Sequence, residues 1–265
     1  MKRFNALTIY AVAYLAFLYL PVLFLPLFSF NDGTIVAFPI KGWTLEWYRQ
    51  LGGQETLIQA LLNSLLVGMV TALMATSMGL FAARAYVRYR FRGKEASEAL
   101  VMLPLVIPGI IVASSMLVLF ISMGLKPSLT AVMLGHTFLA LPFSVSILKS
   151  AFDDFDVSFE EASYDLGCGV VETFRRVTLP IVAPGIVASF LVTFTVSFDE
   201  FVLAFFLSGN QPTLPVYIWS QIRFPAKLPN TLALGSLLLL ASVLLLVVAE
   251  YFRSRSTRSA RSTAS

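Results

Sequence analysis

The sequence has 265 residues, of which 57% are hydrophobic and 13% are charged, and its mean hydropathy is +0.81. A soluble globular protein has about 25% charged residues, so this composition excludes an ordinary soluble domain and indicates a membrane protein. The only cysteine is Cys168, which excludes a disulfide within the chain, and we interpret it as a small packing residue.

Six segments are long and apolar enough to cross a bilayer, since a membrane-spanning helix needs about 20 mostly apolar residues. In chain order they are residues 8–29, 61–83, 99–122, 128–149, 182–207 and 231–252. Several contain proline, which membrane helices tolerate because neighbouring groups satisfy the freed carbonyls. We therefore expect an all-α membrane protein with six transmembrane helices, organised as one domain over 1–253 with a disordered tail at 254–265.

The first apolar run lies where a cleaved signal peptide would also lie. A signal peptide has an apolar core of about 7–15 residues and a cleavage site with small residues. This run extends from about Ala6 to Phe30 and closes with Leu-Phe-Ser-Phe-Asn, which offers no such site. We therefore expect it to be retained as the first span.

The basic residues predict the orientation of the chain. Most of the 19 Lys and Arg residues lie next to span ends that would share one side of the membrane. That side would carry both termini and the loop at 150–181, and the excess of Lys and Arg marks it as cytoplasmic. The net charge of +4 therefore reflects topology and contact with anionic headgroups, which argues against a nucleic-acid partner.

The loop at 150–181 contains a compact, charged, helix-forming segment in an otherwise apolar chain. Ser158 and Glu161 have the spacing of a capping box, in which each side chain accepts a hydrogen bond from a free backbone N–H at the start of a helix. Gly167 and Gly169 can end that helix, because glycine adopts a left-handed conformation without steric cost. A second short helix is expected over 170–177.

Both short helices have an apolar side, formed by Phe159, Ala162 and Leu166 in the first and by Val170, Phe174 and Val177 in the second. A solvated loop that folds back on its own spans would explain this pattern. A docking element for a soluble cytoplasmic partner would explain it equally well. The residue pattern by itself leaves both interpretations open.

Residues in this loop resemble the EAA motif of ABC-importer permeases, which reads Glu-Ala-Ala, three residues, Gly, nine residues, Ile-x-Leu-Pro. The matching residues are Glu161-Ala162-Ser163, Gly167 and Val177-Thr178-Leu179-Pro180, with Ser163 in place of the second alanine and Val177 in place of isoleucine. In that family the segment is a coupling helix that inserts into a cleft of a separate ATP-hydrolysing subunit. The resemblance implies the type I ABC-importer permease fold, with this helix between spans four and five. The implied coupling residues are Glu160, Glu161, Ala162, Ser163, Asp165 and Gly167.

The resemblance covers most of the chain and is strongest to the second permease subunit of spermidine/putrescine importers. The similar segments are 19–22, 29–31, 42–48, 89–94 and 197–209. It implies a homologous permease subunit, a cytoplasmic ATPase dimer and a periplasmic or extracellular solute-binding protein as partners, in a bacterial plasma (inner) membrane. The implied solute is a polyamine. Related permeases for iron, thiamine, opines or amino-acid-like compounds share much of the pattern and stay as alternatives.

The sequence offers no means of hydrolysing ATP by itself. It contains no Gly-x-x-x-x-Gly-Lys-Ser/Thr loop for phosphate binding, and Gly93-Lys94 lacks both the upstream glycine and the hydroxyl residue. One histidine and one cysteine do not make a Cys–His pair or a histidine-rich metal site. We therefore expect a non-enzymatic subunit without cofactor or metal.

Asp199 and Glu200 lie within the apolar fifth span. An ionised side chain at the bilayer centre costs about 2.5–3.5 kcal/mol on insertion scales, so such groups usually face a bundle interior or a water-filled path. We predict that they line the path of the solute in the outer half of the membrane. The alternative is that they cap a broken helix or pair with the partner permease.

A helical wheel of the fifth span separates a polar arc from an aromatic stripe. The polar arc contains Ser189, Thr193, Ser197 and Glu200, with Thr195 and Asp199 beside it, and the stripe contains Phe190, Phe194, Phe198, Phe201 and Phe205. We expect the stripe to pack against lipid or a neighbouring helix and the polar arc to line the translocation path.

Two further groups of residues each have two possible roles. His136 in the fourth span is expected to be a buried hydrogen-bonding group, with a role in gating as the alternative. Trp43, Trp47 and Tyr48 are expected at the level of the headgroups, with contact to the solute as the alternative.

Two other classes of function explain the sequence less completely than a permease subunit does. A proton-coupled carrier that uses Asp199 and Glu200 would explain the acidic fifth span but not the charged loop, and many such carriers contain inverted repeats that this sequence does not show. A membrane scaffold that recruits a cytoplasmic protein would explain the loop but not the polar arc.

Overall fold

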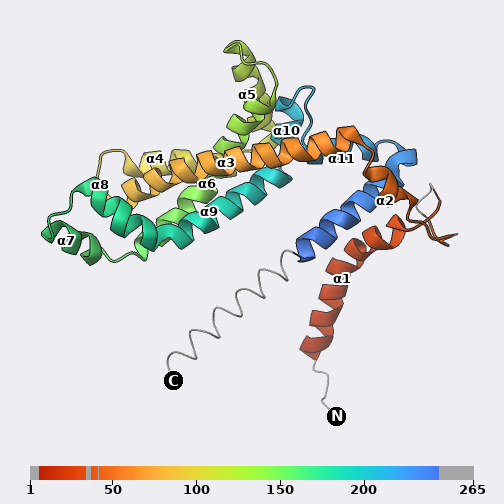
Figure 1. Ribbon diagram of the computed structural model, residues 1–265, viewed down its shortest axis with the longest axis horizontal. Coiled ribbons are helices and arrows are strands. Elements are labelled where there is room, and N and C mark those ends of the chain that lie inside the picture. The colour runs from red at the N-terminus through yellow and green to blue at the C-terminus, as the bar shows by residue number, and fades with distance from the viewer. Residues whose placement is uncertain (1–5, 34–36, 41, 245–265) are drawn as a thin grey trace. The chain divides into compact units, whose positions relative to one another are not determined.

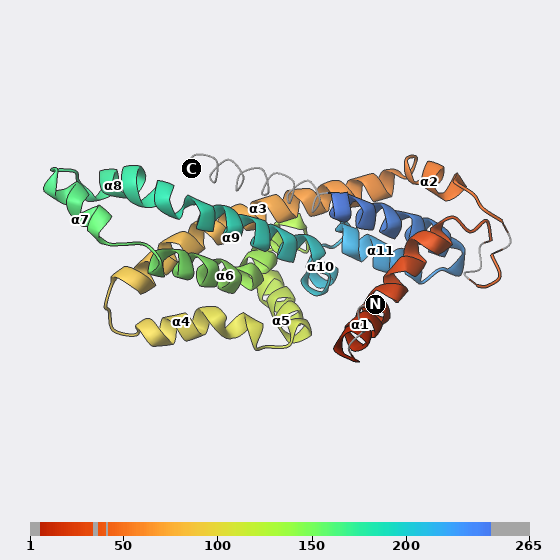
Figure 2. The same ribbon diagram turned by 90° about the horizontal axis from the view of Figure 1, so that it is seen from below.

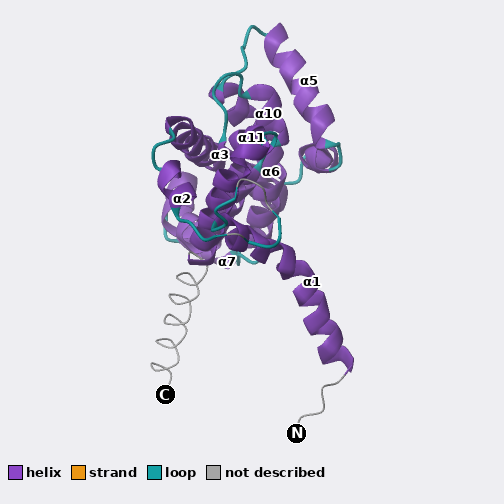
Figure 3. Cartoon of the chain, turned by 90° about the vertical axis from the view of Figure 1, so that its right-hand side faces the viewer, coloured by secondary structure: helices purple, strands orange, loops and turns teal. Residues whose placement is uncertain are grey.

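A computed structural model describes residues 6–33, 37–40 and 42–244 of the chain. Within these residues the regular structure is helical, and the one isolated β-bridge, between Asn31 and Trp43, forms no strand (Figure 3). The contacts divide the chain into two compact units. Unit 2 is Thr56–Tyr217, and unit 1 combines the described residues before it with those after it.

Unit 1 contains the first and last of the long apolar helices. The first is α1, Ala6–Ser29, which has Pro21 and Pro26 within it, and the last is the apolar segment Pro225–Leu244, which starts with η3, Pro225–Lys227. The most apolar window of α1 is not buried in this structure at all. The surface of α1 is therefore available to lipid or to another chain.

The segment after α1 is held by hydrogen bonds to its own aromatic residues. The indole N–H of Trp47 donates to the Asn31 carbonyl at 2.8 Å, and the hydroxyls of Ser29 and Tyr48 lie 2.5 Å apart. Trp47 and Tyr48 both lie in the first turn of the short helix α2, Glu46–Leu51. These bonds explain why Trp47 and Tyr48 are only partly exposed, whereas Trp43 is 68% exposed.

Unit 2 is built on three long helices that lie side by side (Figures 1 and 2). They are α3, Glu55–Arg88, α6, Leu129–Asp153, and α9, Leu179–Asp199. Small residues allow this close packing: a Cβ added to Gly79 would lie 2.1 Å from Ser144 Oγ, and one added to Gly68 would lie 2.9 Å from a ring carbon of Phe194. Membrane helices associate through such small residues because lipid gives them no hydrophobic reason to do so.

The third predicted span is broken rather than straight. Residues 99–122 were expected to form one helix, but α4, Lys94–Met102, continues into η1, Leu103–Leu105, and then bends by 104° into α5, Gly109–Ser122. Pro104 and Pro108 lie at the bend. Because proline lacks a backbone N–H and crowds the preceding turn, two of them within five residues end one helix and start another.

The fifth predicted span also ends earlier than expected. Its helix α9 ends at Asp199, and the chain resumes as α10, Val202–Leu207, after a break at Glu200 and Phe201. The helix α11, Leu214–Ile222, follows. At its other end, α9 is preceded by α7, Ser158–Asp165, by α8, Val170–Thr173, and by the π-helical turn η2, Phe174–Thr178.

Among the described residues, five helices are long and apolar enough to cross a membrane, and a sixth is counted if the bent pair α4–α5 forms one span. The five helices overlap the first, second, fourth, fifth and sixth predicted segments, and the bent pair overlaps the third. The end of the sixth predicted span, the tail at 254–265 and most of the terminal basic residues lie outside the described residues.

Two buried apolar clusters define the ends of unit 2. One lies around α5, α6 and α10 and contains Val67, Ala113, Phe120, Ala131, Val132, Leu203, Ala204 and Leu207. The other lies next to α7–η2 and contains Leu80, Ala83, Leu148, Phe152, Phe155 and Val182. The helices α3 and α6 contribute residues to both clusters, and α9 runs from the second cluster to the segment just before α10. These three helices therefore connect the two ends of the unit.

Candidate functional site

The charged loop folds as two short helices at one end of unit 2 (Figure 1). The helix α7 ends in a Schellman motif: Cys168 N–H donates to the Ser163 carbonyl at 3.1 Å, Gly167 N–H donates to the Tyr164 carbonyl at 2.9 Å, and Gly167 has φ +86°. The predicted stop at Gly167 is therefore confirmed. Gly169 instead is extended and precedes α8.

The predicted capping box at the start of α7 is wrong. The side chains of Ser158 and Glu161 do not cap the helix, and the carboxylate of Asp156 accepts the hydrogen bond from Ser158 N–H at 2.9 Å. Hydrogen bonds from the backbone and the hydroxyl of Ser158 lower the pKa of Asp156 below its usual value. The N-cap position is Val157, one residue earlier than the capping box assumed, so Asp156 replaces Glu161 as the acceptor for Ser158 N–H, and Glu161 N–H donates to the Val157 carbonyl at 3.1 Å.

The six predicted coupling residues divide between two faces of α7. Glu161, Ala162, Asp165 and Gly167 are exposed, whereas Glu160 and Ser163 are 5% and 7% exposed. The Ser163 hydroxyl lies 2.9 Å from the Thr173 hydroxyl of α8, which holds the two short helices together. Ser163 and Glu160 therefore position the helix pair, and the other four residues form its free side.

Glu160 is enclosed by the end of α3 and the start of α9. The Thr178 hydroxyl donates to Glu160 Oε1 at 2.5 Å, and guanidinium nitrogens of Arg84 and Arg88 lie 3.6 and 3.7 Å from the two carboxylate oxygens. We refer to Glu160, Arg84, Arg88 and Thr178 as the Glu160 cluster. The sequence analysis did not connect Arg84 and Arg88 with Glu160, because residues far apart in the chain carry no local pattern that pairs them.

The same two arginines also cover aromatic rings on both sides of α7. Arg84 lies over the ring of Phe174 at 4.4 Å, and Arg88 lies over the ring of Phe155 at 5.0 Å, both within the range of cation–π contacts. Phe155 precedes α7 and Phe174 follows α8. The last turns of α3 therefore contact the loop before and after the coupling segment.

The outer side of the loop is apolar and largely exposed, although the ring of Phe159 contacts that of Phe155. Phe159 is 53%, Leu166 85% and Val171 79% exposed. Beside them is a hollow of about 280 Å³ lined by Val171, Glu172, Arg175 and Arg176. Of the apolar side predicted for the loop, Phe174 packs back against the buried cluster of the spans, whereas Phe159 and Leu166 stay exposed and available to another protein.

Most of the polar arc of α9 faces the neighbouring helices. Ser189 donates to the Ser144 hydroxyl of α6 at 2.8 Å and lies 3.3 Å from the Thr76 hydroxyl of α3, and Thr193 lies 3.5 Å from Thr76. Ser189, Thr193 and Ser197 are at most 4% exposed. In this structure these three residues join helices and do not line an open surface, which differs from the expectation.

Glu200 occupies the break between α9 and α10. Its carboxylate accepts hydrogen bonds from the backbone N–H groups of Val202, Leu203 and Ala204 at 2.8–3.2 Å, so it caps the start of α10. Asp199, the last residue of α9, is exposed. The broken-helix alternative therefore describes Glu200 in this structure, whereas Asp199 is free to meet a solute or another subunit.

His136 connects this break to α6. Its Nδ1 lies 2.8 Å from the Ser197 hydroxyl, and its Nε2 lies 3.2 Å from Glu200 Oε2, although that second contact is too poorly aligned for a hydrogen bond. His136 is 1% exposed, as expected for a buried hydrogen-bonding group. Ser197, His136 and Glu200 therefore form a buried contact that holds α6 to the end of α9.

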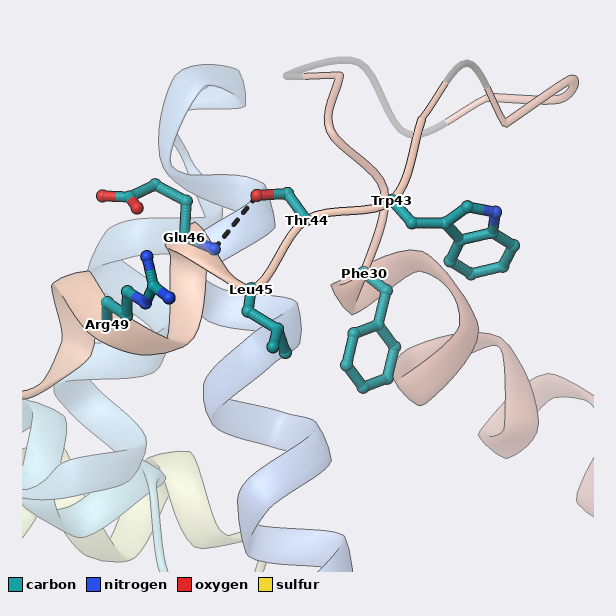
Figure 4. Close-up of a pocket in the computed structure, with 6 residues that line it drawn as sticks. All are labelled: Phe30, Trp43, Thr44, Leu45, Glu46 and Arg49. Carbon is teal, nitrogen blue, oxygen red and sulfur yellow. Dashed lines mark hydrogen bonds between the residues drawn. The ribbon is translucent and has the colours of Figure 1, made fainter.

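Unit 1 has a separate, shallow hollow of about 460 Å³ after α1 (Figure 4). Its residues are Phe30, Trp43, Thr44, Leu45, Glu46 and Arg49. Figure 4 shows the rings of Phe30 and Trp43 on one side and the charged side chains of Glu46 and Arg49 on the other. The Glu46 N–H donates to the Thr44 hydroxyl at 3.1 Å, which starts α2.

Comparison with known proteins identifies the chain from its sequence. Residues 75–258 match the model of a family described as "Binding-protein-dependent transport system inner membrane component". The chain belongs to this family. It is a multi-pass membrane protein and an ABC-importer permease, homologous to permeases named for polyamine transport.

Three relatives illustrate the similarity of this permease to known proteins. The spermidine/putrescine permease PotC of Haemophilus influenzae is 32% identical over 251 residues, 94% of this chain and 97% of that protein. The putrescine permease PotI of Escherichia coli is 32% identical over 250 residues, 91% and 88% of the two chains. A probable molybdenum ABC-transporter permease of Haloferax volcanii is 38% identical over 175 residues, 62% of this chain and 64% of that protein.

Two solved structures share the fold of this permease. A chain of a bacterial ABC transporter involved in alginate import has a TM-score of 0.70 at 14% identity, over 92% of this chain and 94% of that one. A chain of the inward-facing methionine ABC transporter MetNI has a TM-score of 0.57 at 21% identity, over 77% and 95%. At this level of identity the likeness concerns the fold alone.

Proposed function

We propose that this permease forms half of the translocation path of an importer for small organic cations, namely polyamines such as spermidine or putrescine. Two relatives named for polyamine transport, PotC and PotI, are each 32% identical over more than nine tenths of the chain. This similarity along nearly the whole chain is the observation that carries the proposal.

In this proposal the exposed side of α7 docks into a cytoplasmic ATPase dimer. The apolar side chains of Phe159 and Leu166 and the carboxylate of Glu161 form the contact surface, because all three are exposed on or beside α7. The permease itself hydrolyses no ATP. A homologous permease completes the path, and a solute-binding protein delivers the polyamine.

The topology that fits this assembly has six spans, with α4–α5 as a bent third span and both termini on the cytoplasmic side of a bacterial inner membrane. Its support is the excess of Lys and Arg at one set of span ends, the side that also carries α7. The mechanism is alternating access. Closure of the ATPase dimer moves α7, and the motion reaches α6 and α9 through the chain on either side of it.

Asp199 and Glu200 provide the negative charge that a polyamine requires. Asp199 is exposed at the end of α9, and Glu200 is partly exposed next to it, so both carboxylates stand where the helix is interrupted. An organic cation is attracted to such a place and an anion is repelled. This is the reason for preferring a polyamine over the solute of the molybdenum relative, whose match covers only 62% of the chain.

The test is uptake by the complete transporter in proteoliposomes. Radiolabelled spermidine and putrescine should enter only when ATP and the binding protein are present, and collapse of the proton gradient should leave the rate unchanged. Each polyamine should also stimulate the ATPase activity of the complex. Uptake that needs the proton gradient and no ATP would refute the proposal in favour of a secondary carrier, and stimulation by a different solute would refute the polyamine assignment.

A further inference from the structure

The helix α3 is attached to the coupling loop by side chains alone. Along the chain, α7 follows α6 and precedes α9, so these two helices receive any displacement of α7 through the backbone. The helix α3 has 34 residues, which corresponds to about 50 Å at 1.5 Å per residue. A helix of that length reaches from the coupling loop to the opposite end of unit 2.

At the coupling end, the connection is the Glu160 cluster. The side chains of Glu160, Arg84 and Arg88 are only 7%, 15% and 13% exposed, so little water can replace a partner that moves away. A buried carboxylate between guanidinium groups is expensive to separate, since it leaves uncompensated charge. Displacement of α7 therefore carries the end of α3 with it.

The cluster has room for a second arrangement. Both ion-pair contacts are long, at 3.6 and 3.7 Å, and Arg88 Nε and Nη2 are buried without a hydrogen-bond acceptor. The carboxylate accepts one short hydrogen bond, from Thr178 at the start of α9. A small shift of α7 toward α3 would exchange these long contacts for direct hydrogen bonds, so the two helices stay connected when α7 is displaced.

Along its length α3 packs tightly against the other two long helices. Ala72 and Ala75 are fully buried, and Gly68 and Gly79 meet Phe194 and Ser144 with no space for a side chain. A helix in such contact transmits a displacement instead of absorbing it, because close-packed interiors deform little.

At its far end α3 holds the segment between α10 and α11. The side-chain amide of Asn63 donates to the Pro212 carbonyl at 2.9 Å, and Leu214 N–H donates to the Ser64 hydroxyl at 2.7 Å. Asn63 and Ser64 are 3% and 2% exposed. This segment follows the break at Glu200 and the short helix α10, so it belongs to the end of unit 2 opposite the coupling loop.

We propose that α3 is a second mechanical connection of the permease, joined to the coupling helix by Glu160, Arg84 and Arg88 and to the segment at 212–214 by Asn63 and Ser64. These are positioning residues, since they contact neither solute nor nucleotide. The inference rests on the proposed function, because it requires an ATPase that displaces α7. It assigns to α3 the role of moving the far end of unit 2 in step with ATP hydrolysis.

The test measures how many ATP molecules the complete transporter hydrolyses for each solute that it imports. In Glu160→Gln the carboxylate loses its charge while its shape is kept, and we expect the ratio of ATP to solute to rise by about threefold to thirtyfold relative to the wild-type transporter. A merely structural weakening would lower uptake and hydrolysis together and leave the ratio unchanged. The matched control is Glu98→Gln, which removes an ion pair with Lys149 between α4 and α6 and should keep the wild-type ratio.

A second pair of variants tests the far end without touching the loop. Asn63→Ala and Ser64→Ala remove the hydrogen bonds to Pro212 and Leu214, and each should raise the same ratio even if Glu160→Gln fails to assemble. Wild-type ratios in the far-end variants, or a rise in Glu98→Gln equal to that in Glu160→Gln, would overturn the inference. A wild-type complex without ATP-dependent uptake would instead overturn the proposed function.

Discussion

Glu160 and Glu200 lie near opposite ends of α9 and are held in different ways. Glu160 faces two guanidinium groups and one hydroxyl, all from side chains. Glu200 faces three backbone N–H groups and a histidine. The stability of the Glu160 site depends on the negative charge of the carboxylate. The stability of the Glu200 site depends mainly on its oxygen acceptors, because a neutral amide oxygen can also accept hydrogen bonds from backbone N–H groups. Two glutamates that look alike in the sequence therefore have different requirements.

The largest expected effect is the difference in stability between the variants Glu160→Gln and Glu200→Gln. Glu160→Gln should lower the stability of the complex by about 3–5 kcal/mol, because it leaves two arginines without their carboxylate. Glu200→Gln should cost about 1 kcal/mol, because one oxygen remains to cap α10. Thermal unfolding of the purified complex measures both. Equal losses, or a larger loss at Glu200, would contradict the comparison.

The second largest effect concerns His136, which lies beside Glu200. His136→Phe should destabilise the complex by about 1–3 kcal/mol, because the Ser197 hydroxyl loses its buried partner. His136→Gln should cost less, since its amide can still bond to Ser197. The same unfolding measurement distinguishes them, and a phenylalanine variant as stable as the glutamine variant would show that the histidine contributes only its volume.

A smaller effect separates the carboxylate that caps from the one that is free. Asp199→Asn should raise the polyamine concentration for half-maximal uptake by about threefold to fivefold, the size expected when one exposed ion pair is lost. Assembly should be unchanged because Asp199 is exposed. A doubly charged amine should lose less than a triply or quadruply charged one. An unchanged uptake curve would remove Asp199 from the path.

The smallest effect concerns Asp156. Its lowered pKa means that its hydrogen bonds to Ser158 stabilise the fold above the unfolded-state value of 3.8 and are lost as the pH falls through the lower folded-state pKa. At neutral pH, Asp156→Ala should speed amide exchange at Ser158 by less than about fivefold, and Asp156→Asn should change it less. Faster exchange in the asparagine variant than in the alanine variant would contradict the assigned role.

Several features were predictable because they depend on residues close together in the chain. Hydropathy over about 20 residues located the long helices, and Gly167 was identified as the end of α7 because only glycine suits its positive φ. The capping box failed for an equally local reason, since Asp156 accepts from Ser158 N–H, the donor expected for the Glu161 carboxylate, and Glu161 N–H donates to the Val157 carbonyl.

Other features depend on contacts that a single sequence does not contain. The helical wheel grouped Ser189, Thr193 and Ser197 correctly on one face, but it does not say whether that face meets water or another helix. Likewise, Glu160 was grouped with the docking residues because it sits beside Glu161, and only the position of Arg84 and Arg88 shows that it faces inward. Pro104 and Pro108 end one helix and start another within the third predicted span, but the sequence does not give the size of the bend, which is 104°.

The contact between Gly79 and Ser144 restricts how unit 2 can change shape. With backbone against side chain and no intervening space, α3 and α6 are unable to roll past each other without separating. Conformational freedom must then be concentrated where no helix is continuous, and the extended residue Glu200, with ψ 119°, is such a joint. Unit 2 therefore combines a rigid group of helices, α3, α6 and α9, with a flexible joint at Glu200. Substitutions that make the backbone at Glu200 more rigid should stop transport while leaving the packing of these helices intact.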